Sequence, residues 1–146
     1  MSAETVERIG GSAATWDGVT LRPEERPFER IFSLEATAAL VDPEAVYEDA
    51  VLPDHAGEEY RGLDAWVRAA ETWLEPCEWM VVELEQLVDA DDRVVALHRA
   101  RMKMRHTGLE FEMPLAYVHT LKDGRIVRMQ AFADHGKALA SVGLEE

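Results

Sequence analysis

The sequence has a single cysteine, Cys77, and no long apolar run. One cysteine excludes an intramolecular disulfide and any cysteine-based metal cluster. A membrane-spanning helix needs about 20 consecutive apolar residues, and the first residues lack the basic and apolar regions of a secretory signal. We therefore expect a cytoplasmic protein that does not enter a membrane.

Positive charge is scarce as well. The chain has 15 Lys and Arg residues against 29 Asp and Glu residues, which gives a formal net charge of −14 at pH 7. Binding to nucleic acid needs a positive surface that displaces counterions from the phosphates, and anionic membranes attract basic segments. Basic residues do alternate between positions 99 and 105, but Glu110 and Glu112 neutralise part of this stripe. The composition therefore argues against nucleic acid and membranes as partners.

The motifs of phosphate binding and covalent catalysis are also missing. The sequence contains no glycine-rich phosphate loop, no nucleophile elbow and no Ser-His-Asp order. His55 has acidic neighbours, but no second cluster has the spacing of metal ligands. We therefore expect neither a metal nor a bound cofactor.

The clearest pattern that the sequence does contain is a strict alternation between residues 96 and 106. Successive side chains of a β-strand point to opposite faces, so a period of two over this length predicts a strand. One face of this strand holds Ala96, His98, Ala100, Met102, Met104 and His106.

The alternation resumes after Thr107-Gly108, and the apolar face of this second strand holds Phe111, Met113, Leu115, Tyr117 and His119. A two-residue hairpin loop at Thr107-Gly108 places His98 opposite Tyr117 and sets the other pairs in the same register. The apolar face of the hairpin then ends in two neighbouring titratable side chains. This face is a candidate wall of a ligand pocket.

Hydrophobic spacing, prolines and glycines predict the remaining elements. Ser33 is the expected N-cap of a helix that ends at Asp42-Pro43. A later amphipathic pattern includes Trp66 and Trp73. The predicted order begins with a helix within 28–41, a strand at 46–51 and a helix at 62–75. Four strands follow: one at 79–88, one at 93–106, one between the turns at 107–108 and 122–124, and one at 126–133. Helices segregated from a curved antiparallel sheet define a single α+β domain.

Two points of this arrangement stay open. Residues 1–27 form a polar leader that lies over the pocket mouth, exchanges with a partner subunit or stays loose. A three-residue loop at 122–124 points Met129, Ala131 and Ala133 inward, whereas a two-residue loop points Ile126, Arg128 and Gln130 inward. We prefer the three-residue loop because it gives the more apolar face.

This order of elements resembles the nuclear transport factor 2-like superfamily, and within it the SnoaL-like polyketide cyclases and the ketosteroid isomerases. The resemblance implies a conical half-barrel, in which N-terminal helices pack on the concave face of a strongly curved mixed or antiparallel sheet. It places this domain at residues 28–146 and implies a homodimer formed through the convex face of the sheet. The matching stretches are VDPEAVYEDA (41–50), YRG (60–62), LVDADDRVVAL (87–97) and AYVHTLKDGRIVRMQAFAD (116–134) with the tail KALASVGL.

The resemblance also implies catalytic residues. The general base of the ketosteroid isomerases falls on Asp49 and the donor to the substrate oxygen falls on Tyr117, which has His98 as its partner in the hairpin. The oxyanion tyrosine of that family would lie near Glu25 and is missing. The resemblance, the hairpin face and the helical spacing together give a substrate wall of Trp66, Trp73, Met102, Met104, His106, Phe111, Met113, Leu115, His119 and Met129.

Two classes of function fit these residues. The first is a cofactor-independent isomerase, cyclase or dehydratase acting on a hydrophobic carbonyl compound, because proton abstraction next to a carbonyl needs a base and a donor aimed at the oxygen. The second is a non-catalytic dimeric module that binds a small apolar molecule or serves in assembly. In the second case His98 and Tyr117 form a hydrogen-bonded core pair that fills the narrow end of the cone.

Overall fold

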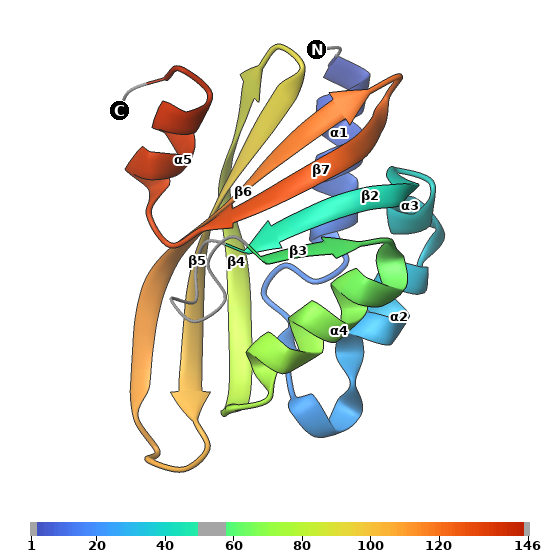
Figure 1. The fold of residues 1–146 in the computed structure, drawn as a ribbon. Helices are drawn as coiled ribbons and strands as arrows, with labels where there is room; N and C mark the ends of the chain where they lie inside the picture. The colour runs from blue at the N-terminus through green and yellow to red at the C-terminus, as the bar shows by residue number, and fades with distance from the viewer. Residues whose placement is uncertain (1–2, 50–57, 145–146) are drawn as a thin grey trace.

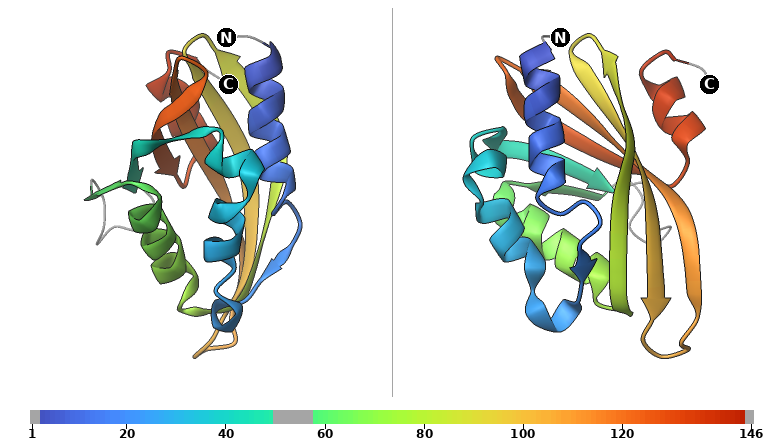
Figure 2. Two further views of the ribbon diagram at one scale, coloured as in Figure 1. Left: turned by 90° about the vertical axis from the view of Figure 1, so that its right-hand side faces the viewer. Right: turned by 180° about the vertical axis from the view of Figure 1, so that it is seen from behind.

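The computed structural model describes residues 3–49 and 58–144, which form one curved sheet with helices on both of its sides (Figure 1). Four helices lie on the concave side, and the C-terminal helix α5 lies on the other side (Figure 2). No helix in the described ranges is long and apolar enough to cross a bilayer. The helices are α1 (Ala3–Ala14), η1 (a 3₁₀ turn, Pro23–Glu25), α2 (Pro27–Ser33), α3 (Glu35–Ala38), α4 (Leu63–Leu74) and α5 (His135–Ser141).

The sheet has the strand order β1-β4-β5-β6-β7-β2-β3. All neighbouring strands are antiparallel except β2 and β7, which run parallel. The α+β class and the curved mixed sheet predicted from the sequence are confirmed. The strands are β1 (Thr20–Leu21), β2 (Val41–Asp49), β3 (Glu58–Arg61), β4 (Cys77–Ala90), β5 (Arg93–Met104), β6 (Glu110–Lys122) and β7 (Arg125–Phe132).

The helix expected within residues 28–41 is two short helices. Leu34 has an extended backbone, with φ −63° and ψ 141°, and this separates α2 from α3. Ser33 is therefore the last residue of α2 rather than an N-cap, and its hydroxyl donates to the Arg30 carbonyl at 2.9 Å. Strand β2 also begins earlier than predicted, at Val41, while residues 50 and 51 of the predicted strand lie outside the described residues.

The β5–β6 hairpin has a longer loop than the predicted Thr107-Gly108 turn. Strand β5 ends at Met104 and β6 begins at Glu110, so Met102 pairs with Phe111 and His98 pairs with Leu115. The predicted register is wrong by two residues. A shift by an even number keeps every side chain on its face, so the predicted inner face survives the error.

The last hairpin combines features of both predicted loops. Asp123 and Gly124 form a two-residue turn with φ of 54° and 77°, which is typical of a type I′ turn. The preferred three-residue loop is therefore wrong. A register shift between Thr120 and Leu121 then moves the pairing by one residue, so that His119 pairs with Met129. This bulge places Met129 on the cavity side even though Ile126 also lies there.

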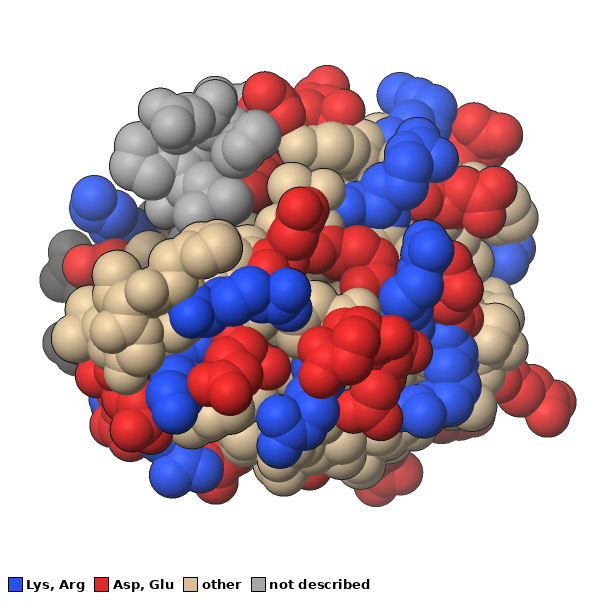
Figure 3. All heavy atoms as spheres, turned by 90° about the horizontal axis from the view of Figure 1, so that it is seen from below, with Lys and Arg blue, Asp and Glu red and all other residues tan. Residues whose placement is uncertain are grey.

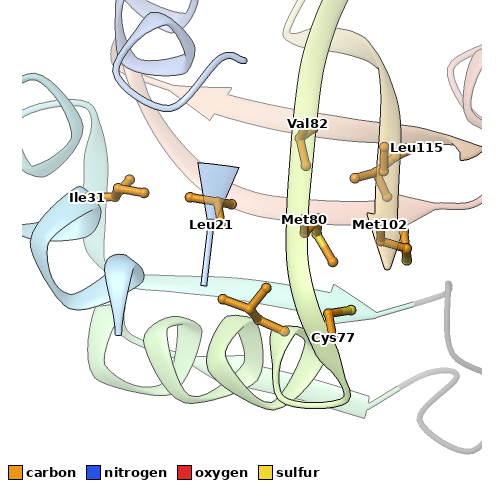
Figure 4. Packing of buried hydrophobic residues seen from close by; sticks show 9 residues of the cluster. Leu21, Ile31, Cys77, Met80, Val82, Met102 and Leu115 are labelled. Carbon is orange, nitrogen blue, oxygen red and sulfur yellow. The ribbon is translucent and has the colours of Figure 1, made fainter. Parts of the chain in front are cut away.

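The N-terminal residues pack against the rest of the domain. Ile9 and Ala13 of α1 are buried, and the Asp17 carboxylate accepts a 2.7 Å hydrogen bond from the Leu84 amide. Further along the chain, β1 pairs with β4. The adjoining core cluster draws its side chains from β1, α2, α4, β4, β5 and β6; the labelled members are Leu21, Ile31, Cys77, Met80, Val82, Met102 and Leu115 (Figure 4).

Two glycine substitutions should change stability in opposite directions. Gly124→Ala forces a Cβ onto a residue with φ of 77°, so we expect the free energy of unfolding to fall by about 1 kcal/mol. Gly11→Ala, inside α1 with open space at the Cβ position, should raise it by about 0.5–1 kcal/mol because alanine loses less entropy in a helix. Urea unfolding of both variants measures the difference, and equal signs would contradict the turn assignment.

Candidate functional site

A cavity of about 120 Å³ lies between the concave face of the sheet and the helices that cover it. Small and apolar side chains of α1 and α2 form one wall, and residues of α4 form another. No Lys, Arg, Asp or Glu is found among the described residues that line it. Its polar lining consists of hydroxyl groups and aromatic nitrogens from Ser12, Trp16, Thr37, Tyr47, Trp66, Trp73, His98, Tyr117 and His119.

Aromatic rings follow one another along the inner face of β5 and β6. The ring centroids of Trp16 and His98 are 5.0 Å apart, and those of His98 and Tyr117 are 5.2 Å apart with an edge-to-face tilt. Tyr117 and His119 follow at 6.3 Å. Edge-to-face and tilted contacts at these distances are favourable, so the rings hold one another in place at the cavity wall.

The Tyr117 side chain lies between two alanines. In the sheet it pairs with Ala96 on β5 and with Ala131 on β7, and Ala131 pairs in turn with Asp49 on β2. Paired residues share a face of the sheet, so Asp49, Ala131 and Tyr117 form a row on the inner face. Adjacent strands are about 4.8 Å apart, and the methyl groups of the two alanines leave space beside the phenol ring.

Asp49 is buried, with 4% of its surface exposed. It is not among the residues that line the cavity, although Ala131 and Tyr117 of the same row are. Its charge raises the pKa of Tyr117, an effect that adds to the larger one of burial. The carboxyl group thus lies beyond Ala131 in the same row, close enough to Tyr117 to act electrostatically on the phenol.

Tyr47 is a site residue that the sequence analysis missed. It lies two positions before Asp49 on the same face of β2, lines the cavity, and contacts Trp66 and Tyr60 with ring centroids 6.1 and 5.8 Å away. Burial, followed by Tyr117 and Asp49, raises its pKa above the ordinary tyrosine value. The alternation of β2 was the available signal, because it places Tyr47 and Asp49 on one face.

His98 and His119 are uncharged at neutral pH. Burial, with a smaller effect of His135, lowers the pKa of His98 to about 4. Burial and the neighbouring His98 lower the pKa of His119 to about 3. The His98 ring hydrogen-bonds the Glu83 backbone, while Nδ1 of each histidine is buried without a hydrogen-bond partner among the described residues. The imidazoles can therefore accept or donate hydrogen bonds, but they carry no positive charge for an anion.

The structure separates the predicted substrate wall into two groups. Trp66, Trp73, Leu115, His119 and Met129 line the cavity together with the predicted catalytic residues His98 and Tyr117. The other group extends toward the tip of the β5–β6 hairpin and does not line it: Met102, Met104, His106, Phe111 and Met113. Met102 is buried in the adjoining core, and His106 is exposed in the turn.

Metal-ligand side chains are not gathered at this site. Within residues 3–49 and 58–144 no group of three or more His, Cys, Asp or Glu side chains is arranged to hold a metal ion. His55 and Asp54, considered in the sequence analysis, lie outside the described residues.

The fold and the cavity define a class of protein. A curved α+β half-barrel, whose concave face is closed by N-terminal helices, is the architecture of the nuclear transport factor 2-like superfamily. A family profile described as a SnoaL-like domain matches residues 32–129, which is more than half of the chain. The protein therefore belongs to the SnoaL-like family. No curated protein sequence gives a significant match.

Solved structures share this fold. A nuclear transport factor 2-like protein from Burkholderia thailandensis is 24% identical, with 94% of this chain and 95% of that chain covered and a TM-score of 0.67. A proposed SnoaL-like polyketide cyclase from Jannaschia is 16% identical, with coverages of 77% and 79% and a TM-score of 0.58. A protein with a ketosteroid isomerase-like fold from Catenulispora acidiphila, solved in complex with trimethylamine, is 18% identical, with coverages of 99% and 95% and a TM-score of 0.59.

The two buried histidines should make stability depend on pH. Their folded-state pKa values of about 4 and about 3 lie below the ordinary value of 6.5, so the unfolded chain binds more protons between these limits. We expect each histidine to remove about 1.4 kcal/mol of stability per pH unit as the pH falls from 6.5 toward its folded pKa.

Urea unfolding of the wild type and of the His98→Gln and His119→Gln variants measures this dependence. The measurements are made at about pH 7.0, 6.0 and 5.0, which extend from above the ordinary pKa into the range where stability should fall. Each variant should have a shallower slope of stability against pH, whatever its absolute stability. His106→Gln is the matched control, because His106 is exposed. Parallel slopes for the wild type and all three variants would show that the buried imidazoles titrate normally.

Proposed function

We propose that the protein is a cofactor-independent acid/base enzyme that binds a small hydrophobic carbonyl compound in the 120 Å³ cavity. The observation that carries the proposal is the row formed by Asp49, Ala131 and Tyr117, which sets a buried carboxyl group two strands from a half-buried phenol at an apolar cavity. Isomerisation, cyclisation and dehydration all begin with the same step. That step is removal of a proton from a carbon next to a carbonyl.

In this step the Asp49 carboxylate takes the proton, and the electron pair of the C–H bond becomes a carbon–carbon double bond. The carbonyl oxygen gains the negative charge and accepts a hydrogen bond from the Tyr117 hydroxyl. The raised pKa of Tyr117 keeps the phenol protonated at neutral pH, as a donor requires. A donor at a developing oxyanion stabilises the transition state more than the ground state.

The enolate then has three outcomes that conserve atoms. The protonated Asp49 returns the proton to another carbon, which is isomerisation. The enolate carbon attacks a second carbonyl, whose oxygen takes the proton from Asp49, which is cyclisation. A hydroxyl group at the β-position takes the proton from Asp49 and leaves as water while the enolate electron pair forms the new double bond, which is dehydration. His98 remains neutral in each case, because its pKa of about 4 is far below physiological pH, and it orients Tyr117 through their ring contact.

A second candidate function is non-catalytic binding or assembly. Asp49 does not itself line the cavity, and His98 and Tyr117 are in ring contact with each other. Both observations fit a site in which the polar groups serve to hold the fold while the cavity binds an apolar molecule.

The enzyme proposal is tested by solvent exchange of α-protons. A panel of small ketones in D₂O, followed by NMR, should include compounds whose exchange the wild type accelerates. Asp49→Asn should lower that rate by a factor of about 10²–10⁴, because it removes the general base. Tyr117→Phe should lower it by about 10²–10³, because it removes the donor.

The exposed residue His106 supplies the control variant, His106→Gln, which should exchange at the wild-type rate. Near-ultraviolet circular dichroism of all variants shows whether the fold is kept. Exchange that persists in a folded Asp49→Asn variant would refute the assignment of the base, and a cavity that binds ketones without any exchange would support the binding module.

We also propose that two copies associate through the outer face of β4–β6. Basic residues of β5 alternate there with acidic residues of β4 and β6, as in the 3.2 Å ion pair between Lys103 and Glu78. This alternation of charge on β4–β6 is complementary to its own copy under twofold symmetry. Both charge signs are also interspersed in a different view of the surface, the face seen from below (Figure 3).

Light scattering at several concentrations measures this association. Arg101 is exposed on β5 next to Trp79 and pairs with Glu112, so Arg101→Glu should raise the dimer dissociation constant at least tenfold (about 1.4 kcal/mol). Arg30→Glu, on the exposed side of α2, is the control and should leave it unchanged. A wild-type protein that stays monomeric at all concentrations would contradict the proposal.

A further inference from the structure

The size of the cavity limits what the protein binds. Sites for drug-sized ligands have volumes of roughly 300–1,000 Å³, whereas an engineered protein cavity of about 150 Å³ accommodates one benzene molecule. The cavity of about 120 Å³ is therefore matched to a single six-membered ring with a small substituent. A molecule with several fused rings does not fit between these walls.

The charges around the cavity limit the ligand further. No basic side chain lines it in the described part of the chain, and His98 and His119 are neutral because their pKa values are far below 7. A carboxylate that entered would lose its hydration without gaining a cation, which costs several kcal/mol. Asp49 adds a buried acidic group in the same row as Tyr117 and makes an anion still less favourable.

The polar atoms of the lining require a ligand that bears oxygen. The Trp73 indole N–H can only donate a hydrogen bond, and it is buried without a partner among the described residues. The hydroxyls of Tyr47 and Tyr117 stay protonated and can donate too. Nδ1 of His98 is a buried ring nitrogen, also without a partner in the described ranges. In the tautomer whose other nitrogen donates to the Glu83 carbonyl, Nδ1 accepts. A hydroxyl group can accept from these donors and can donate to Nδ1, and a carbonyl oxygen can accept from the donors, whereas a quaternary ammonium can do neither.

We infer that the ligand of this cavity is an uncharged molecule of about one ring, such as a phenol or a cyclic enone, that carries a hydroxyl or carbonyl oxygen. The inference rests on the proposed function only in taking this cavity as the ligand site. It excludes carboxylates and multi-ring compounds as substrates of this chain.

Tryptophan fluorescence offers a direct test, because Trp16, Trp66 and Trp73 all line the cavity. The probes are phenol and cyclohex-2-enone as neutral single rings, benzoate as an anion of similar size, tetramethylammonium as a cation, and 2-naphthol as a two-ring phenol. Absorbance corrections and thermal shifts check each titration. We expect phenol and cyclohex-2-enone to bind at least tenfold more tightly than the other three probes.

Cavity-filling variants show where the probes bind. Ala131→Leu places a larger side chain beside Tyr117, and Ala70→Leu does the same from α4. Either variant should weaken phenol binding at least tenfold, and the second serves if the first fails to fold. Ala140→Leu makes the same change on the exposed side of α5 and should leave binding unchanged.

Several results would overturn the inference. They are the absence of saturable binding of both neutral rings, tighter binding of benzoate, tetramethylammonium or 2-naphthol, and phenol binding that neither folded cavity variant weakens. The outcome is separate from that of the proposed reaction. Binding of single rings without α-proton exchange supports the inference and refutes catalysis. Exchange on larger ketones without binding of single rings supports catalysis and refutes the inference.

Discussion

The parallel pairing of β2 with β7 is the constraint on which the site depends. Asp49 and Ala131 are far apart in the sequence, and this pairing makes them neighbours. The antiparallel pairing of β7 with β6 then adds Tyr117 to the same row. Hydrogen bonds of a sheet fix such positions more rigidly than a loop does. The site is thus built on backbone geometry, and the helices contribute mainly walls.

The outer side of the same strands secures this pairing. Arg128 of β7 bonds the carboxylate of Glu48 on β2 and, at 2.8 Å, that of Glu59 on β3. Gln130 donates to Glu48 as well, at 3.1 Å. Because side chains alternate along a strand, these contacts lie opposite the inner row that contains Asp49 and Ala131. One network therefore ties three strands together without entering the cavity.

The sequence was sufficient for the faces of the strands and insufficient for their register. Alternation alone placed His98, Tyr117 and His119 on the inner face, since side chains of a strand alternate whatever their partners are. The partners depend on loop length and bulges, which involve the backbone more than side-chain type. The β5–β6 loop is longer than the predicted Thr107-Gly108 turn, and the bulge between Thr120 and Leu121 was not predicted. Helix α1 was missed for a related reason: its Gly10-Gly11 pair disfavours a helix locally, and tertiary packing of Ile9 overrides that preference.

The neutral state of the cavity follows from the same burial that stabilises the fold. The side chains that pack His98 and His119 away from water lower the pKa values of both rings, and the same desolvation raises those of Tyr47 and Tyr117. Each shift favours the uncharged form, so burial leaves hydrogen-bonding groups without a net cation at the wall. In the proposed reaction, an oxyanion formed here would be stabilised by neutral donors rather than by an ion pair. Donors of this kind act most strongly where water is excluded, which is why a small apolar cavity and this chemistry belong together.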